Sequence, residues 1–114
     1  ILLFTGNVEV EFGEESFEIK ATYWYDKEIA YDEVESIEYR DEKISGTRTG
    51  GWGSMRLLLG DFNNKEFGNY LRYTYNHCDA GIILVVKDKE IVVSGEDAES
   101  TYEIYTELMK HCKL

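Results

Sequence analysis

Apolar and polar residues alternate through most of the first 95 positions, and this period of two restricts the chain to a largely β fold. Val8, Val10 and Phe12 would face one side of a strand, while Glu9 and Glu11 would face the other. Further strand-like runs cover residues 17–23, 34–40, 55–59, 70–75, 82–86 and 91–93. The chain contains no proline, so every strand interior keeps its backbone donor. The pattern predicts about seven strands.

The period changes near residue 97, where apolar residues begin to recur at helical steps of four and three. The members of this stripe are Ala98, Tyr102, Tyr105, Met109 and Cys112. Acidic side chains gather at the start of this segment and basic ones at its end, which complements a helix dipole. We therefore expect a helix over about residues 97–111 that covers a curled antiparallel sheet or small barrel.

Chain length and cysteine content set the domain organisation. A chain of 114 residues with 43% hydrophobic residues is expected to form one domain, residues 1–114. The opening residues 1–5, which begin Ile-Leu-Leu-Phe, are a first strand, an expression remnant or the end of a preceding hydrophobic segment. Two cysteines are too few for a disulfide framework. Cys78 and Cys112 either pair or are buried separately, and separate burial is favoured.

The charge of the chain restricts its partners. With 12 basic and 23 acidic residues the formal net charge is -11, which argues against nucleic acid and against broad adhesion to anionic lipid. Residues 44–76 differ, because they carry four bases and two acids, together with six of the ten glycines. This acid-poor third is therefore the expected contact region of an otherwise acidic protein.

Several motifs in the central and later strands resemble one family. They are Ile44-Ser45-Gly46-Thr47-Arg48-Thr49-Gly50-Gly51-Trp52-Gly53, Leu57-Leu58-Leu59-Gly60-Asp61-Phe62, Phe67-Gly68, Tyr73-Thr74-Tyr75, Ile83-Leu84-Val85-Val86-Lys87 and Ile91-Val92-Val93-Ser94. Followed by a closing helix, they resemble the bacterial pleckstrin-homology (PH)-like domains over about residues 8–111. The resemblance implies a mainly β fold, a seven-stranded split barrel of two near-orthogonal antiparallel sheets capped by a C-terminal helix. It also implies frequent attachment to membrane-spanning segments, and it brings no catalytic residue and no cofactor.

The first hairpin departs from the phosphoinositide-binding members of the wider fold. Those relatives use a basic hairpin, whereas this one carries five glutamates against the single Lys20. Like charges would repel a phosphate there, so phosphoinositide binding is disfavoured.

The glycine-rich segment 46–53 is the sharpest candidate site. Its glycines permit positive φ, and successive amides can form an anion-binding nest. The segment lacks the lysine of a phosphate loop and the third glycine of a dinucleotide fingerprint. Three interpretations stay open: a wide structural loop, a protein or oligomer contact, and a small-anion site. The candidate binding residues are Arg48, Gly50, Gly51, Trp52, Arg56, Arg72 and Tyr73.

Other reactive residues favour structural roles. His77, Cys78 and Asp79 are neighbours on an extended chain, so their side chains point to opposite faces and cannot form one catalytic set. The two His-Cys pairs lack ordinary zinc-ligand spacing, and the acidic clusters lack a calcium-loop pattern, so no metal site is expected.

These observations favour a non-enzymatic binding or assembly module that acts through protein–protein or self-association contacts. The resemblance places it in a bacterial, membrane-associated protein, at the cytoplasmic face or in the cytoplasm, with any tether outside this segment. The alternative is a sensor of a small anion or acidic ligand that uses the loop 46–53.

Overall fold

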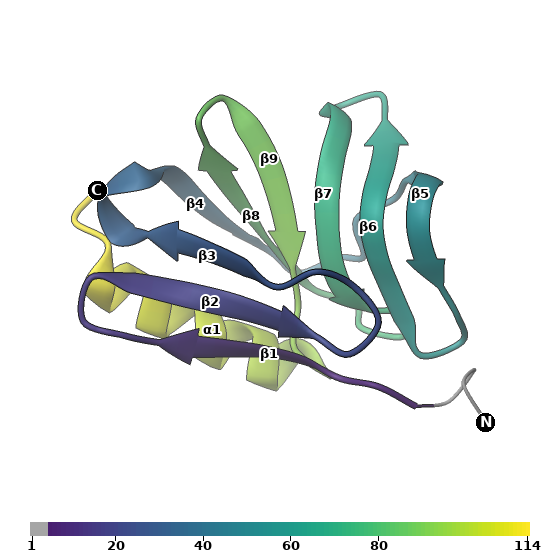
Figure 1. Cartoon of the computed structure of the whole chain (residues 1–114), viewed down its shortest axis with the longest axis horizontal. Helices are drawn as coiled ribbons and strands as arrows, with labels where there is room; N and C mark the ends of the chain where they lie inside the picture. The colour runs from purple at the N-terminus through teal and green to yellow at the C-terminus, as the bar shows by residue number, and fades with distance from the viewer. Residues whose placement is uncertain (1–4) are drawn as a thin grey trace.

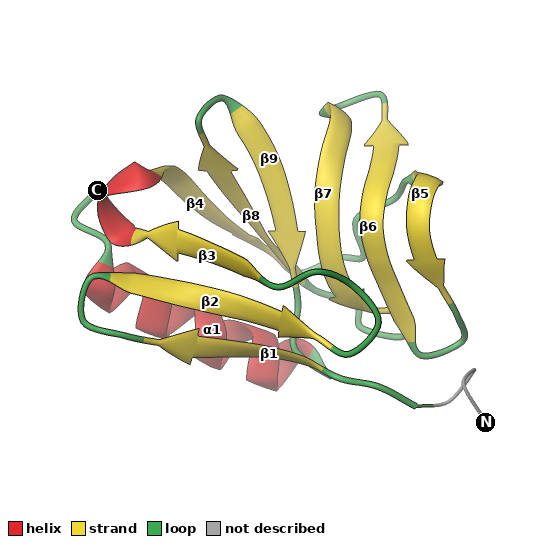
Figure 2. Ribbon diagram, in the orientation of Figure 1, coloured by secondary structure: helices red, strands yellow, loops and turns green. Residues whose placement is uncertain are grey.

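The computed structural model describes residues 5–114, which form two β-sheets and one α-helix (Figures 1 and 2). The small sheet has the order β1-β2-β3 and the large sheet the order β4-β8-β9-β7-β6-β5. The strands are β1 (Val8–Phe12), β2 (Ser16–Ala21), β3 (Lys27–Ala30), β4 (Val34–Arg40), β5 (Thr47–Gly53), β6 (Leu57–Asn64), β7 (Gly68–Tyr75), β8 (Gly81–Val86) and β9 (Lys89–Val93). A 3₁₀ turn, Tyr31–Glu33, joins the sheets, and α1 (Ala98–His111) ends the fold. The opening residues 1–4, for which a first strand was one expectation, lie outside the described part.

The predicted class, mainly β with two crossing sheets and a C-terminal helix, is confirmed. The described residues form nine strands instead of about seven, because β3 and β5 were not expected. β3 is only four residues long, and it lies between the strand-like runs 17–23 and 34–40. One pairing also differs from the expected antiparallel pattern, since β7 and β9 run parallel.

The core lies between the two sheets, and the large sheet is buried on both faces. Leu57, Leu59 and Leu84 are fully buried on the inner face. On the outer face a second cluster contains Ile44, Phe62, Tyr70, Ile83 and Val92. Ile44 comes from the segment between β4 and β5, so this segment covers the outer face. Because both faces of the adjacent strands are buried, these strands carry apolar residues on both sides.

The helix α1 begins with a capping box. The Asp97 carboxylate accepts a hydrogen bond from the Ser100 N–H at 2.8 Å, and the Ser100 hydroxyl accepts one from the Asp97 N–H at 3.1 Å. The helix packs on β4 and β8, and His111 stacks on Phe12 of β1. It therefore closes one side of the space between the sheets.

The buried stripe of α1 is rotated from the predicted one. Thr101, Leu108 and Cys112 are buried, whereas Tyr102 and Met109 are 51% and 44% exposed. Thr101 tolerates burial because its hydroxyl donates to the Asp97 carbonyl at 2.6 Å and accepts from the Gly95 N–H at 2.9 Å. Within residues 5–114, no helix combines the length and apolar character that a membrane span requires.

Candidate binding groove

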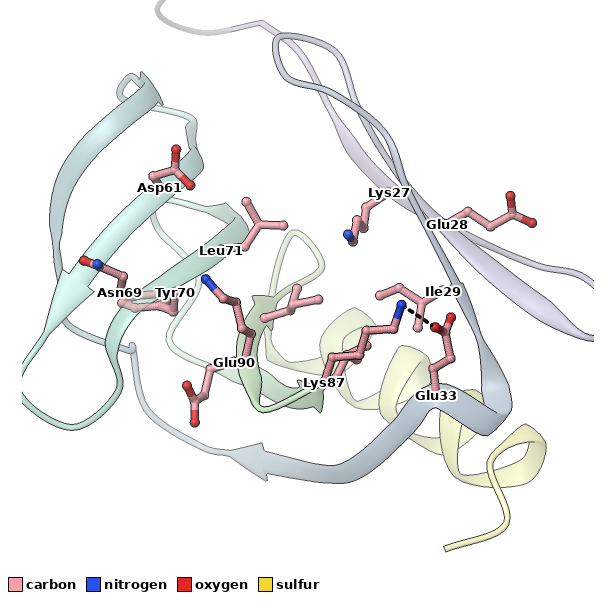
Figure 3. A pocket seen from close by; sticks show the side chains of 13 residues that line it. Lys27, Glu28, Ile29, Glu33, Asp61, Asn69, Tyr70, Leu71, Lys87 and Glu90 are labelled. Carbon is pink, nitrogen blue, oxygen red and sulfur yellow. Dashed lines mark ion pairs between the residues drawn. The ribbon is translucent and has the colours of Figure 1, made fainter.

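A groove opens between β3 and the diverging ends of β7 and β9, and no residue of α1 lines it (Figure 3). Its volume is about 470 Å³, within the range of about 300–1,000 Å³ that is typical of ligand sites. Ile29, Leu71 and Ile91 provide apolar walls, and lysine side chains lie around them. The groove thus combines apolar surface with cations drawn from both sheets.

The groove exists because the parallel pairing of β7 with β9 is short. The two strands pair only over 71–73 and 91–93. Before these residues, β7 pairs only with β6 and β9 only with β8. The ends of β7 and β9 that line the groove therefore each have one backbone edge without a partner strand.

The β8–β9 turn fixes one wall of the groove. Lys87 and Asp88 have φ angles of 52° and 64°, which is the left-handed conformation that both central residues of a type I′ turn require. The Lys87 ammonium lies 2.9 Å from a carboxylate oxygen of Glu33, and the Asp88 N–H donates to Glu35 at 3.1 Å. The turn is thus anchored through Glu33 to the 3₁₀ turn that joins the two sheets and through Glu35 to β4.

Strand alternation directs lysines into the groove and glutamates away from it. Lys27 and Ile29 share the inner face of β3, while Glu28 lies between them on the outer face. On β9, Lys89 and Ile91 likewise share one face. Figure 3 shows the Glu28 and Glu90 carboxylates pointing away from the cavity, although both residues border it.

Two of the three groove lysines have no carboxylate partner. The Lys87 ammonium and the Ala30 N–H both donate to Glu33 and hold the pKa of its carboxyl below the usual value. Neither Lys27 nor Lys89 forms an ion pair with any carboxylate of residues 5–114. The acids on the opposite wall of the groove are Asp61 on β6 and Glu90 on β9, and the Glu90 carboxylate points away from the cavity. The groove therefore offers two free ammonium groups on a protein whose net charge is -11.

The segment predicted to be a wide glycine-rich loop is the edge strand β5, which corrects the loop assignment. Gly51 has a φ of +110°, and a Cβ atom there would lie 2.3 Å from the Leu59 carbonyl oxygen. The Gly50–Gly51 pair therefore allows close approach to β6, opposite Asp61 and Gly60. Successive amides of a strand point in opposite directions, so this backbone forms no anion nest.

The candidate residues of β5 and the following turn do not converge on one site. Trp52 is half-buried, with its ring 4.9 Å from that of Tyr23, and its indole N–H is buried without a partner. Arg48 is exposed and its guanidinium lies over Gly53. The Arg56 guanidinium is engaged elsewhere, because it donates to the Gly6 carbonyl at 2.6 Å, Asn7 at 2.9 Å and Glu96 at 3.2 Å.

Arg72 and Tyr73 lie in the interior, at 2% and 1% exposure, on opposite faces of β7. Arg72 donates to the Thr74 hydroxyl at 2.8 Å, the Ile44 carbonyl at 2.6 Å and the Tyr70 hydroxyl at 3.0 Å. The Tyr73 hydroxyl donates to the Tyr25 carbonyl at 2.6 Å, and burial raises the pKa of Tyr73 to about 12. Both side chains are thus structural, and the surface proposed below does not include them.

The groove residues were not among the candidates from the sequence. Lys27 and the run from Lys87 to Glu90 fall between the strand-like runs of the sequence, and charged residues between strands carry little information alone. A signal was present, since Lys89 shares its strand face with the apolar Ile91. The convergence of β3 with β9 depends on tertiary packing, however, and local pattern does not contain it.

The reactive residues take the structural positions expected. Cys78 and Cys112 are both buried and free, and burial raises the pKa of the Cys112 thiol. Cys78 points inward, with its sulfur 3.4 Å from the Thr101 hydroxyl, while His77 and Asp79 are exposed. Across the described chain, His, Cys, Asp and Glu side chains form no group of three that would suit a metal ion.

Comparison with known proteins identifies the family. No curated protein and no solved structure matches the chain. The family model described as bacterial PH domain matches residues 8–109, which include all nine strands and most of α1. PH domains are in general non-catalytic modules that mediate protein or lipid interactions. With two crossing sheets, a closing helix and this match over most of its length, the chain belongs to the bacterial PH domain family.

Proposed function

We propose that this PH domain is a non-catalytic module that binds a partner protein by taking an acidic side chain of that partner into the groove. The observation that carries the proposal is the pair of unpaired ammonium groups, Lys27 and Lys89, beside the apolar walls of the groove. Four acids also line the groove, but Lys87 pairs with Glu33, and the Glu28 and Glu90 carboxylates point away from the cavity. An acidic side chain that enters the groove therefore meets two cations free to pair with it.

The two kinds of groove surface have different roles. A solvent-exposed ion pair contributes about 0.2–1 kcal/mol, whereas burial of one aliphatic side chain contributes about 1.5–3 kcal/mol. Of the apolar wall residues, Leu71 stays partly exposed, whereas Ile29 and Ile91 are 1% and 4% exposed and form the floor of the groove. An apolar side chain of the partner would gain most of its contact at Leu71, and the lysines select for an acid. Because the net charge repels an acidic partner at long range, association should become faster as salt increases.

The alternative, a small-anion sensor built on residues 46–53, receives less support. This segment is a paired strand, and Trp52 packs on Tyr23 instead of opening a binding loop. The exposed guanidinium of Arg48 leaves room for a secondary protein contact at the β5 edge, including one with a second copy of the domain.

The proposal extends to location. Bacterial PH domains are often membrane-associated, and we place this one at the cytoplasmic face, held by a tether outside residues 5–114. The acidic outer face of the small sheet supports tethering over direct adhesion to anionic lipid. A tether would leave the groove accessible to a protein partner.

Titration of the ¹⁵N-labelled domain with a pool of hexapeptides, each containing one acidic and two apolar residues, tests the proposal. Amide shifts are expected at residues 27–29, 69–71 and 87–91, and a pool with glutamine in place of the acid should bind more weakly. The double variant K27E/K89E should lose about tenfold in affinity. The control K65E/K113E makes the same charge change on exposed lysines outside the groove. Equal loss in both variants, or shifts confined to β5, would contradict the proposal.

A further inference from the structure

The backbone of β3 indicates how a partner enters the groove. Resting on the proposed function, we infer that the occupant is an extended peptide segment that adds as a strand to the free edge of β3. Its side chains follow the order apolar, basic, acidic, with the apolar and acidic residues facing the groove. Three independent features support this inference: the unpaired backbone of Glu28, the row of acids on the outer face, and the order of side chains on the inner face.

β3 has a backbone pair available for an added strand. It is the last strand of its sheet and pairs only with β2. The Tyr31 N–H donates to the Glu15 carbonyl at 3.0 Å, so alternation directs the backbone of Lys27 and Ile29 toward β2 as well. The backbone groups of Glu28 then point to the open edge, where they have no partner within residues 5–114. One added residue opposite Glu28 would satisfy both its N–H and its carbonyl.

The outer face of the small sheet carries a row of acids that ends at this edge. Glu11 lies opposite Glu18, and Glu18 lies opposite Glu28. Like charges directly across a sheet are destabilising. Lys20 offsets the first two, with distances of 3.3 Å to Glu11 and 3.8 Å to Glu18, but no cation of the described chain pairs with Glu28. A basic residue opposite Glu28 on an added strand would continue the row with the complementary charge.

The inner face of β3 determines which residues of the added strand would flank its basic residue. Lys27 and Ile29 are two positions apart, so an added strand would place one side chain beside each of them. An acid suits Lys27, and an apolar residue suits Ile29 (Figure 3). Lys89 of β9 lines the wall opposite Lys27 and favours the same acid. Antiparallel addition, the more stable pairing, passes Ile29 first and yields the order apolar, basic, acidic. Asp61 on the far wall disfavours a second acid.

The test uses three hexapeptides of one composition, with a central Val-Lys-Glu, Glu-Lys-Val or Val-Glu-Lys order, and measures Kd by calorimetry. Val-Lys-Glu should bind best, and Val-Glu-Lys should lose about tenfold, because it places an acid beside Glu28 and a base beside Lys27. Methylation of the peptide nitrogen at the central lysine should cost a further roughly three- to tenfold, since that N–H would bond to Glu28. Methylation at the preceding valine, whose N–H would point away from β3, should leave Kd nearly unchanged.

A reciprocal charge change separates this pairing from a general charge effect. E28K should bind a Val-Glu-Glu peptide more tightly than Val-Lys-Glu. The control E14K makes the same charge change in the exposed β1–β2 turn and should keep the original preference. Absence of this reversal would overturn the pairing of the base with Glu28.

The outcomes distinguish the inference from the function on which it rests. If Val-Lys-Glu shifts the groove amides but its order and methylation have no effect, strand addition is wrong and the proposed groove function stands. If the groove amides respond only to inorganic phosphate or anionic phospholipid vesicles, both proposals fail. If they shift with domain concentration alone and the domain dimerises, the occupant is a second copy and the peptide inference is overturned.

Discussion

At the scale of single residues, Arg72 shows how a predicted surface group can be part of the interior. Strand alternation is enough to put Arg72 and Tyr73 on opposite faces of β7. It did not reveal that both faces are covered, because the cover over Arg72 is Ile44, from a segment 28 positions earlier in the chain. Packing between distant segments therefore decided the exposure of this guanidinium.

Replacement of Arg72 by alanine should reduce the free energy of unfolding by about 2–4 kcal/mol, because three buried acceptors would lose their donor. Those acceptors are the Thr74 hydroxyl, the Ile44 carbonyl and the Tyr70 hydroxyl. The control R48A truncates an exposed arginine and should change stability by less than about 0.5 kcal/mol. Urea denaturation of both variants measures the difference, and equal midpoints would contradict the structural role of Arg72.

At the scale of elements, long strands and the helix were predictable, whereas β5 was not. Strong alternation in β1, β2 and β4 and the helical period of α1 are local signals, and the structure has elements there. β5 reads as a loop because glycine is depleted in strands. Its glycines have a tertiary purpose, since a Cβ at Gly51 would meet the Leu59 carbonyl of the adjacent strand. The sequence alone does not show which strand approaches a glycine.

Gly51→Ala should therefore destabilise the fold by about 2–4 kcal/mol, from the positive φ and from the clash with β6. Gly68→Ala is the matched control, because Gly68 has a φ of +71° but nothing lies within 4 Å of an added Cβ. Its cost should be only about 1 kcal/mol. Thermal unfolding followed by circular dichroism compares them. A Gly51 variant as stable as the Gly68 variant would show that close strand approach does not limit this position.

At the scale of the whole molecule, acid should destabilise the domain. The pKa values of Asp97, Glu33 and Glu66 are lowered in the folded state, by the Ser100 N–H, by Lys87 and by Arg40 respectively. Folded carboxyls with lowered pKa bind fewer protons than unfolded ones. Their contribution is therefore present above the ordinary values of about 4–4.5 and is lost as pH falls below them. Relief of the net negative charge acts in the opposite direction and makes the loss shallower.

The pH dependence of Tm between pH 7 and pH 3 measures this effect. Asp97→Asn should keep the helix cap but flatten the acid limb of the curve, because asparagine caps a helix without titrating. Asp32→Asn, an exposed aspartate that caps no helix, should leave the limb unchanged. An identical acid limb in D97N and wild type would contradict the assignment of this proton linkage to the cap.

The whole fold was more predictable than the groove. Periodicity, chain length and the resemblance together predicted two sheets, a closing helix and the family. The groove depends on where β7 and β9 separate, and this is set by a parallel pairing of residues 20 positions apart. The family resemblance gives the topology of such a domain but not the residues that line this gap.

The short parallel contact between β7 and β9 also bears on how the domain can change over generations. It leaves the charged rim of the groove to residues at strand ends, Lys27 and Lys89, which are exposed and belong to neither core cluster, whereas the apolar floor of Ile29 and Ile91 belongs to the core. Substitutions at such positions usually change stability by less than about 0.5 kcal/mol. Ligand preference is therefore nearly uncoupled from foldability, so one scaffold can acquire new partners through single exchanges at this rim.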